Sequence, residues 1–364
     1  MVKQFDRKLV LENGTEYLGY GFGVINNKVT ELVFDTSMIG YEEVVSDPAY
    51  LGQTIVMTYP LIGNYGIAEE DLVTKAPVIG GFVVREYNNS PSNFRYTKTL
   101  SEVMEENGIA GIYGVDTRKL TAYLRDNGSC KALITDINTD TAKAVEIIKA
   151  ADTSVNISDV SCKKCWYSRT PNPKYNVVAI DCGITYGAVR LLNERGCNVS
   201  VVPYNVTVEE IEKMKPDGIY VSSGPGDPKA AIEIAELIKE LRGKYPIVAV
   251  GLGMQLLCLS YGADTYRLKV SHHGGNYPIK NTENGKVEIT VQNHCYAVSE
   301  ESLKNTDLTV TYKNILDGSV EAVECQMDRV IGTQYYLDDS EGPNGRISVI
   351  DRFRNLMKEG KHNA

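Results

Sequence analysis

Two glycine-rich turns are the segments of this sequence whose residue types and spacing could do chemistry. The first spans 222–228 and reads SSGPGDP, and its glycines would let the backbone approach a ligand closely. On its own it is explained equally well as a tight turn in which Asp227 caps the next helix. The second lies within 245–259, which read YPIVAVGLGMQLLCL and place a sharp bend between a strand and a helix. That pattern is typical of a nucleophile elbow, the turn that presents an attacking side chain.

The elements that must position these turns alternate regularly in the second half of the chain. Repeated strand and helix units of this length predict an α/β fold with a mainly parallel sheet covered by helices. Because ligands of such sheets bind beyond the carboxyl ends of the strands, we expect the site after Val221 and Val250. The expected strands are 176–181, 198–203, 218–222 and 247–250, and the expected helices are 186–195, 208–214, 229–242 and 254–259.

The first half is expected to be an α+β domain rich in β structure. Between 152 and 174 periodicity fades while Ser and Pro accumulate, as is typical of a linker. We therefore predict an N-terminal domain at 1–151, a linker at 152–174 and an α/β domain at 175–364. Expected elements of the first domain include strands at 8–11, 21–24 and 78–84 and helices at 100–107 and 117–126.

Length and composition limit the classes of function. The 364 residues suffice for two or three domains, and 43% hydrophobic with 23% charged residues is typical of a globular protein. With 38 basic against 47 acidic residues the net charge is -9, which disfavours a nucleic-acid partner because phosphate neutralisation needs clustered Lys and Arg. The apolar runs are only strand-sized, so we expect no membrane span. Residues 1–10 lack a secretory signal, so we expect a cytoplasmic protein whose eight cysteines are reduced.

Seven segments, the two turns among them, form a pattern that extends over nearly the whole chain. The others are FDTSMIGY at 34–41, VR at 84–85 with SNFR at 92–95, GVDTRKL at 114–120, HHGGNYP at 272–278 and QNH at 292–294. With these segments in order, the chain resembles the small, glutaminase subunit of carbamoyl phosphate synthetase. In that family the elbow reads roughly GICLGHQ and the preceding turn SNGPGDP. The resemblance implies a β-rich N-terminal domain followed by a class I glutamine amidotransferase domain. One such turn is weak evidence, but chance rarely supplies seven in register.

The resemblance also implies where a glutaminase site would lie. In the family a Cys thiolate attacks the side-chain amide of glutamine, a His activates the thiol, and a Glu orients the His. By position, the Cys is replaced by Gly251, the His by Tyr336 and the Glu by Asp338. The chain has four His and none between His294 and His362, so no His of that segment can substitute for the lost base. The site is therefore expected to lack its nucleophile and its base.

The rest of the expected site follows from the same resemblance. The elbow position is often strained, at a cost of ~1–3 kcal/mol for a residue with a Cβ, so Gly251 keeps the fold while removing the reaction. Met254 stands where the family commonly has His and makes the pocket more apolar. The sequence leaves open whether glutamine still binds. By resemblance, the backbone N–H groups of Gly224 and Leu252 would form the oxyanion hole, and Ser37, Gly226, Gly253, Gln255 and Asn293 are further candidate ligand contacts.

Other cysteines could in principle replace the lost thiol. Cys258 lies two helical turns beyond the elbow, roughly 10 Å away at ~1.5 Å per residue, and is better explained as a core residue. Cys295 follows His294 and could be activated by it. Adjacent residues of an extended strand point to opposite faces, however, so this pair would not naturally meet.

No metal site is expected. Cys162 and Cys165 have metal-ligand spacing, and the two lysines between them would lower a thiol pKa, but half of a zinc ligand set is missing. The preferred explanation is a partly exposed linker. His272 and His273 lie within a segment that resembles a structural loop of the family, so they receive no catalytic role.

Two hypotheses for the function follow. In the first, the chain is a glutaminase-inactive scaffold or regulatory subunit of a carbamoyl phosphate synthetase that uses free ammonia. Its partner would be a large ATP-grasp subunit that binds ATP and Mg, with no cofactor in this chain, and the pathway would be arginine or pyrimidine biosynthesis. In the second, the chain has left that complex, and its altered pocket binds a metabolite or another protein. A working glutaminase that uses Cys295 is a third, weaker alternative.

Overall fold

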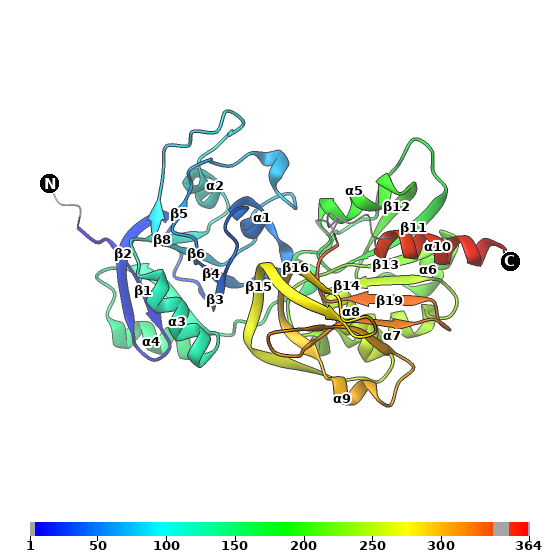
Figure 1. Cartoon of the computed structure of the whole chain (residues 1–364). Helices are drawn as coiled ribbons and strands as arrows, with labels where there is room; N and C mark the ends of the chain where they lie inside the picture. Colours follow the sequence, from blue (N-terminus) through cyan, green and yellow to red (C-terminus); the bar gives the residue numbers. More distant parts are fainter. Residues whose placement is uncertain (1–3, 338–348, 363–364) are drawn as a thin grey trace. The chain divides into compact units, whose positions relative to one another are not determined.

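The computed structural model describes residues 4–337 and 349–362, and the chain divides into two compact units (Figure 1). The first unit comprises Met1–Val155 with Lys269–Gly274, and the second comprises Asn156–Leu268 with Gly275–Ala364. All eight cysteines are free thiols. Within the described ranges, no helix is both long and apolar enough to cross a bilayer.

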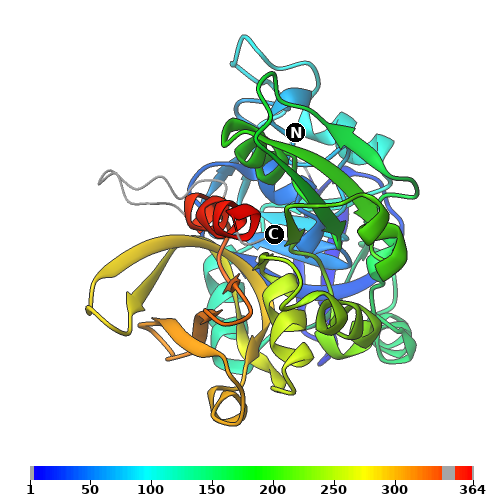
Figure 2. The ribbon, with the colours of Figure 1, turned by 90° about the vertical axis from the view of Figure 1, so that its right-hand side faces the viewer.

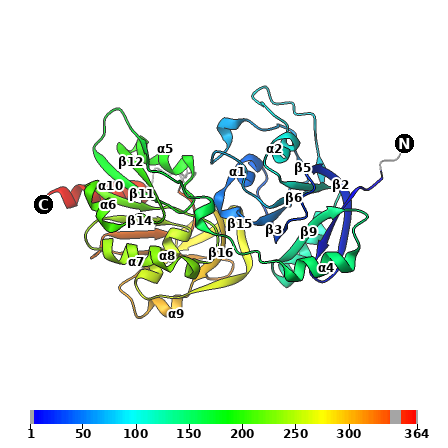
Figure 3. The ribbon, with the colours of Figure 1, turned by 180° about the vertical axis from the view of Figure 1, so that it is seen from behind.

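The first unit is built around a closed barrel with strand order β1-β2-β8-β6-β4-β3-β9. Strands β3, β4, β6 and β8 run parallel to one another, and β1, β2 and β9 close the barrel through antiparallel pairs. Side chains such as Leu9, Leu32 and Ile112 fill its apolar core. The amphipathic helix α4 covers β1 and β9 through Ala144 and Ile148, and Figure 3 shows it alongside β9.

These are the bounds of the first unit's helices and strands. They are β1 Arg7–Leu11, β2 Glu16–Gly23, β3 Val29–Asp35, α1 Tyr41–Ser46, β4 Gln53–Met57, β5 Leu61–Ile62, β6 Gly81–Val84, β7 Glu86–Tyr87, α2 Leu100–Glu106, β8 Ala110–Tyr113, α3 Thr117–Asn127, β9 Cys130–Asp136 and α4 Thr141–Ala150, with short 3-10 helices at Pro48–Tyr50 and Glu69–Asp71.

The second unit contains a ten-stranded sheet of order β10-β12-β11-β13-β14-β19-β18-β17-β15-β16 among the described residues. Its centre, β12-β11-β13-β14-β19, is parallel, as the alternation of strands and helices predicted. One core cluster includes residues of α7 and α8, and another includes residues of α5 and α10, so helices cover both faces. Figure 3 shows α7 and α8 side by side, and the long curved strand β15 (yellow) is clearest in Figure 2.

These are the bounds of the second unit's helices and strands, with β15 running through both units. They are β10 Trp166–Ser168, β11 Tyr175–Asp181, α5 Tyr186–Glu194, β12 Cys197–Pro203, α6 Val208–Lys213, β13 Gly218–Val221, α7 Ile232–Leu241, β14 Ile247–Val250, α8 Leu252–Ser260, β15 Thr265–Asn281, β16 Val287–Val298, α9 Glu300–Leu303, β17 Thr309–Asn314, β18 Val320–Cys325, β19 Val330–Thr333 and α10 Val349–His362, with 3-10 helices at Ile157–Asp159 and Pro228–Ala231.

Two segments differ from the sequence-based expectation in kind, while others, such as the strand expected at 78–84 (β6, Gly81–Val84), differ only in their bounds. The expected linker contains β10, which pairs antiparallel with β12 through Trp166 and Val201 and so extends the sheet. The expected helix at 229–242 begins as a 3-10 turn at Pro228 and continues as α7 from Ile232. The first difference arises because three residues paired on one edge are too short for any periodicity to reveal.

Candidate functional site

The elbow is formed by Gly251, which joins β14 to α8. Its N–H donates to the Thr333 carbonyl oxygen of the neighbouring strand β19 at 2.8 Å, and its backbone angles are φ 57° and ψ -117°. Side chains rarely adopt this conformation. A Cβ on Gly251 would also lie 2.4 Å from Ser223 Oγ and 2.9 Å from Ser223 Cβ. The strand, turn and helix expected of a nucleophile elbow are present, and the turn as packed has no room for a side chain.

The 222–228 turn packs against the elbow, and much of its composition has a structural explanation. A Cβ on Gly224 would lie 2.1 Å from the Cys182 carbonyl oxygen, so glycine is needed for close backbone contact. Gly226 has φ 92°, which favours glycine. The Asp227 carboxylate accepts from the Lys229 N–H at 2.9 Å and caps the 3-10 turn that follows. Asp227 is therefore explained as a capping residue, and Gly224 and Gly226 are explained by the backbone of the turn.

Helix α8 is pressed onto the end of β13. A Cβ on Gly253 would lie 2.5 Å from the Val221 carbonyl oxygen, so the helix could not approach so closely with a larger residue. Met254 is fully buried in the core cluster, and a Cβ on Gly332 would lie 2.9 Å from its Cγ. Met254 is thus a packing residue between helix and sheet. Leu252 begins the helix, where the first backbone N–H groups have no partner inside the helix.

Gln255, expected to contact a ligand, is held by the protein itself. Its side-chain Nε2 donates to the Tyr296 carbonyl oxygen at 2.8 Å and to Gln334 Oε1 at 3.0 Å. The Gln334 backbone N–H in turn donates to the Glu321 carbonyl oxygen at 2.8 Å. These bonds connect α8 to β16, to β18 and to the residue after β19, all within the second unit.

Tyr336, which the resemblance places at the position of the family's His, is anchored by its backbone. Its N–H donates to the Val291 carbonyl oxygen of β16 at 3.0 Å. The half-buried side chain packs against the core cluster that includes Val189 of α5 and Phe353 of α10. An aromatic packing residue therefore lies where the resemblance would place the His that activates the thiol. Asp338 lies outside the described residues.

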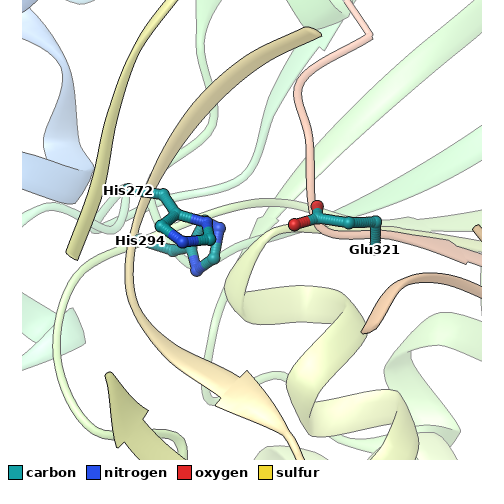
Figure 4. A group of neighbouring side chains, drawn as sticks. All are labelled: His272, His294 and Glu321. Atoms are coloured by element: carbon teal, nitrogen blue, oxygen red, sulfur yellow. The ribbon is translucent and has the colours of Figure 1, made fainter. Parts of the chain in front are cut away.

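A buried polar network lies beside this region, and Figure 4 shows two of its members, His294 of β16 and Glu321 of β18. Gln292 links them, because its Nε2 donates to Glu321 Oε2 at 2.9 Å while its Oε1 lies 3.1 Å from His294 Nε2. The other ring nitrogen of His294 lies 2.8 Å from the Tyr296 carbonyl oxygen. Both ring nitrogens of His294 are thus engaged with groups other than the neighbouring thiol of Cys295.

The remaining thiols are poorly suited to nucleophilic attack. Cys258 is fully buried in the core, and burial raises its pKa. Burial and the Asp181 carboxylate raise the pKa of Cys162 to about 12, which is opposite to the effect expected from the adjacent lysines. Because the thiolate is the nucleophile and the metal ligand, both environments oppose reactivity. Cys165 is half-buried at the end of the same segment.

The other expected contacts are distributed over both units. Ser37 belongs to the first unit, where its N–H donates to Asp35 Oδ1 at 2.6 Å. Asn293 is buried in the second unit, next to His294. His272, also labelled in Figure 4, and His273 belong to the Lys269–Gly274 segment of the first unit, where the His273 carbonyl oxygen accepts from the Thr36 N–H at 3.2 Å.

Sequence reasoning missed the polar residues that surround the elbow. Ser223 was passed over as part of a turn, although its side chain occupies the space over Gly251. Gln334, Gln292 and Glu321 are buried polar residues on or next to strands, and Glu321 lies between the apolar residues Val320 and Ala322. A charged or amide side chain inside an apolar strand was the available signal, because such groups are buried only with partners.

Both halves of the chain are similar to known protein families. The family model "Carbamoyl-phosphate synthase small chain, CPSase domain" matches residues 9–134, and the model "Glutamine amidotransferase class-I" matches residues 178–356. The chain is 43% identical over 359 residues to a carbamoyl phosphate synthase small chain of Bacillus cereus, covering 98% of each chain. It is 45% identical to that of Fusobacterium nucleatum, covering 96% of this chain and 97% of the relative. Among solved structures, a glutamine amidotransferase of Thermotoga maritima aligns at 16% identity with a TM-score of 0.36, covering 45% of this chain and 76% of that one.

Proposed function

Because the chain belongs to the carbamoyl phosphate synthase small chain family, we propose that it is a subunit without glutaminase activity in a synthase that uses free ammonia. The observation that carries the proposal is Gly251. A glutaminase of this class forms an acyl-enzyme on a thiolate at the elbow, and glycine offers no atom that could attack. The backbone strain and the proximity of Ser223 oppose any side chain at this position.

The surroundings of the elbow support the same conclusion. Tyr336 supplies no imidazole, and its phenol belongs to a packed cluster. His294 precedes Cys295 in the sequence, but its ring nitrogens face the Tyr296 carbonyl oxygen and the Gln292 side chain. The imidazole next to Cys295 is therefore bonded to other groups, which argues against a relocated nucleophile.

The proposed partner is the large subunit that members of this family serve. That subunit would bind ATP and Mg and would take ammonia directly from solution, while this chain acts as a scaffold or regulatory cap. We place the complex in the cytoplasm and in arginine or pyrimidine biosynthesis. The intact core of both units supports a structural role, since loss of the nucleophile has not opened the elbow.

The test compares nitrogen donors in the reconstituted complex. The chain is purified with its large subunit, and carbamoyl phosphate is measured with ammonium or with glutamine labelled at the side-chain amide. We expect synthesis with ammonium and no transfer of label from glutamine. A matched preparation of the large subunit alone shows what this chain adds with ammonium. Robust glutamine-dependent synthesis would overturn the proposal.

A second candidate is a chain that has left the complex and binds a metabolite or another protein. The observation in its favour is a pair of buried polar atoms beside the elbow, Ser223 Oγ and Gln334 Nε2, without a hydrogen-bond partner. Co-purification from the source cells distinguishes the two candidates. Recovery of a synthase large subunit in stoichiometric amount favours the first, and a genome without such a subunit favours the second.

A further inference from the structure

The loop that follows β7 in the first unit presents an aromatic side chain to solvent. Phe94 is 95% exposed, and no other large apolar side chain in the described part of the chain is more exposed. Scattered apolar residues are normal on protein surfaces. A ring that is left almost entirely in water is a different case, because buried aromatic residues supply much of the binding energy of protein interfaces. Packing within the first unit therefore does not explain Phe94.

Hydrogen bonds hold the backbone on both sides of Phe94. Before the ring, the Ser92 N–H donates to the Asn64 carbonyl oxygen at 3.1 Å. After the ring, the Thr97 N–H donates to the Ile67 carbonyl oxygen at 2.9 Å. Both ends of the loop are thus attached to the segment 64–67. A loop held in this way presents its side chain in a fixed direction, so that binding costs less conformational entropy.

Arg95, the residue after the ring, fixes the tip of the loop. Its guanidinium donates to Glu70 Oε1 at 2.8 Å and to Asp71 Oδ1 at 2.7 Å. Its backbone N–H donates to Asn93 Oδ1 at 3.1 Å. Exposed ion pairs add little to stability, but a guanidinium shared between two carboxylates restricts the backbone beside Phe94. The loop is therefore ordered although its aromatic residue contributes little to the core.

The surface around Phe94 carries more acidic than basic groups. All three residues of the 3-10 helix Glu69–Asp71 are acidic, and the cations that pair with them are Arg95 and Lys98. Lys98 is shared with a further carboxylate, that of Glu106, at 2.7 Å. Two cations thus face four carboxylates, and the surroundings of the ring are net negative. This charge disfavours nucleic acid and anionic lipid as the partner and favours a protein surface with a basic rim.

We propose that Phe94 is an anchor by which this chain docks on the large subunit, with its ring inserted into an apolar pocket that basic residues of that subunit surround. The inference rests on the proposed function, which names this partner. A second copy of the chain is the less suitable occupant. The chain has a net charge of -9, so an acidic loop is repelled by another copy. The pocket that fits this loop is apolar at its centre and basic at its rim.

The test measures the rates at which the full chain binds to and leaves the purified large subunit, in a buffer without any nitrogen donor. Phe94→Ala should accelerate dissociation roughly 10- to 100-fold and leave the association rate almost unchanged, because close apolar contacts act on the dissociation rate. Ile147→Ala is the matched control, since Ile147 is a 38% exposed apolar residue of α4 in the same unit. It should leave both rates unchanged. Because Phe94 lies in solvent, Phe94→Ala should unfold at the same urea concentration as the unmodified chain.

The acidic surroundings of the ring give a second readout. Association should slow as the NaCl concentration is raised, because salt screens the attraction between an acidic loop and a basic rim. Glu69→Gln removes one charge from a side chain that is 70% exposed, and it should slow association at low salt while dissociation stays almost unchanged. Association that becomes faster with salt would show that the surface facing the loop is acidic, and it would overturn the proposed pocket.

Several outcomes would overturn the role of Phe94. They are equal dissociation rates of Phe94→Ala and the unmodified chain, an equal acceleration by Ile147→Ala, and no binding of the unmodified chain to the large subunit. Self-association that Phe94→Ala abolishes would assign the ring to a second copy and would overturn it as well. The rates are measured without a nitrogen donor, so glutamine-dependent synthesis would refute the proposed lack of glutaminase activity and leave the docking result in place.

Discussion

Replacement of Gly251 by Ala is the most direct test of how the elbow is constrained. The backbone at Gly251 has φ 57° and ψ -117°, and holding alanine there costs about 1–3 kcal/mol. The added Cβ would lie 2.9 Å from Ser223 Cβ, which hydroxyl rotation alone does not relieve, and overpacking of this kind costs about 1–3 kcal/mol. We therefore expect the free energy of unfolding of the second unit to fall by about 2–6 kcal/mol.

Urea denaturation followed through Trp166 fluorescence measures this loss in the unit that contains the elbow. Gly262→Ala is the matched control, because Gly262 follows α8 with φ 85° and has no atom within 4 Å of the point that a Cβ would occupy. The control introduces backbone strain alone, so the difference between the two variants isolates the contact with Ser223. If Gly251→Ala destabilised the unit no more than Gly262→Ala, the reasoning about a filled elbow would be refuted.

Three further predictions concern the ionisation of Glu42, the restoration of a Cys and a His at the elbow, and the ion pair between Arg352 of α10 and Glu324. Burial raises the pKa of Glu42 from 4.5 to about 7, so the stability that it contributes below pH 4.5 is lost as the pH rises to 7. Glu42→Gln should therefore stabilise the first unit by up to about 3 kcal/mol at pH 8 and have little effect at pH 4. Hydrogen exchange of the barrel amides measures this stability, and equal effects at both pH values would contradict the prediction. Gly251→Cys combined with Tyr336→His should recover some labelling by a glutamine-mimicking electrophile while neither single variant does, and glutamine hydrolysis by Tyr336→His alone would contradict the assignment. Arg352→Lys should lower the free energy of unfolding by about 1 kcal/mol, because Arg352 binds both carboxylate oxygens of Glu324. Glu324→Gln, made with and without Arg352→Lys, is the control that shows whether the loss comes from this pair.

The sequence predicted the second unit well only between β11 and α8, where the periodicity is local, and it predicted none of the strands from β15 to β19. Strand β14 and helix α5 lie within one residue of their expected bounds, since apolar runs and helical spacing are properties of neighbouring residues. The barrel of the first unit was not predicted beyond its richness in β structure. Its closure depends on the pairing of β9 with both β1 and β3, and such long-range pairs leave no periodic mark. The strand β10 was missed because its three residues are too few to show a period.

The sequence shows which residues occupy the positions of the candidate site, but it does not show which side chains surround them. The identity of Gly251 and Tyr336 can be read from the chain once the motif is aligned. The filling of the elbow by Ser223 cannot, because that depends on how the ends of β13 and β14 meet in three dimensions. Orientation of the Gln334 amide likewise depends on Gln255, which is 79 residues away in sequence.

The proposed function requires that the elbow keeps its shape without a nucleophile, and the atoms that build the turn are backbone atoms. The turn is set by the Gly251 N–H bonded to the Thr333 carbonyl oxygen, and by Gly224 and Gly253, which allow close backbone contacts. None of these interactions involves the side chain at position 251. Replacing a thiol there with hydrogen removes strain from the backbone and leaves every one of them in place. The proposed loss of the reaction would therefore carry no structural penalty at the elbow, where the side chain of Ser223 lies over Gly251.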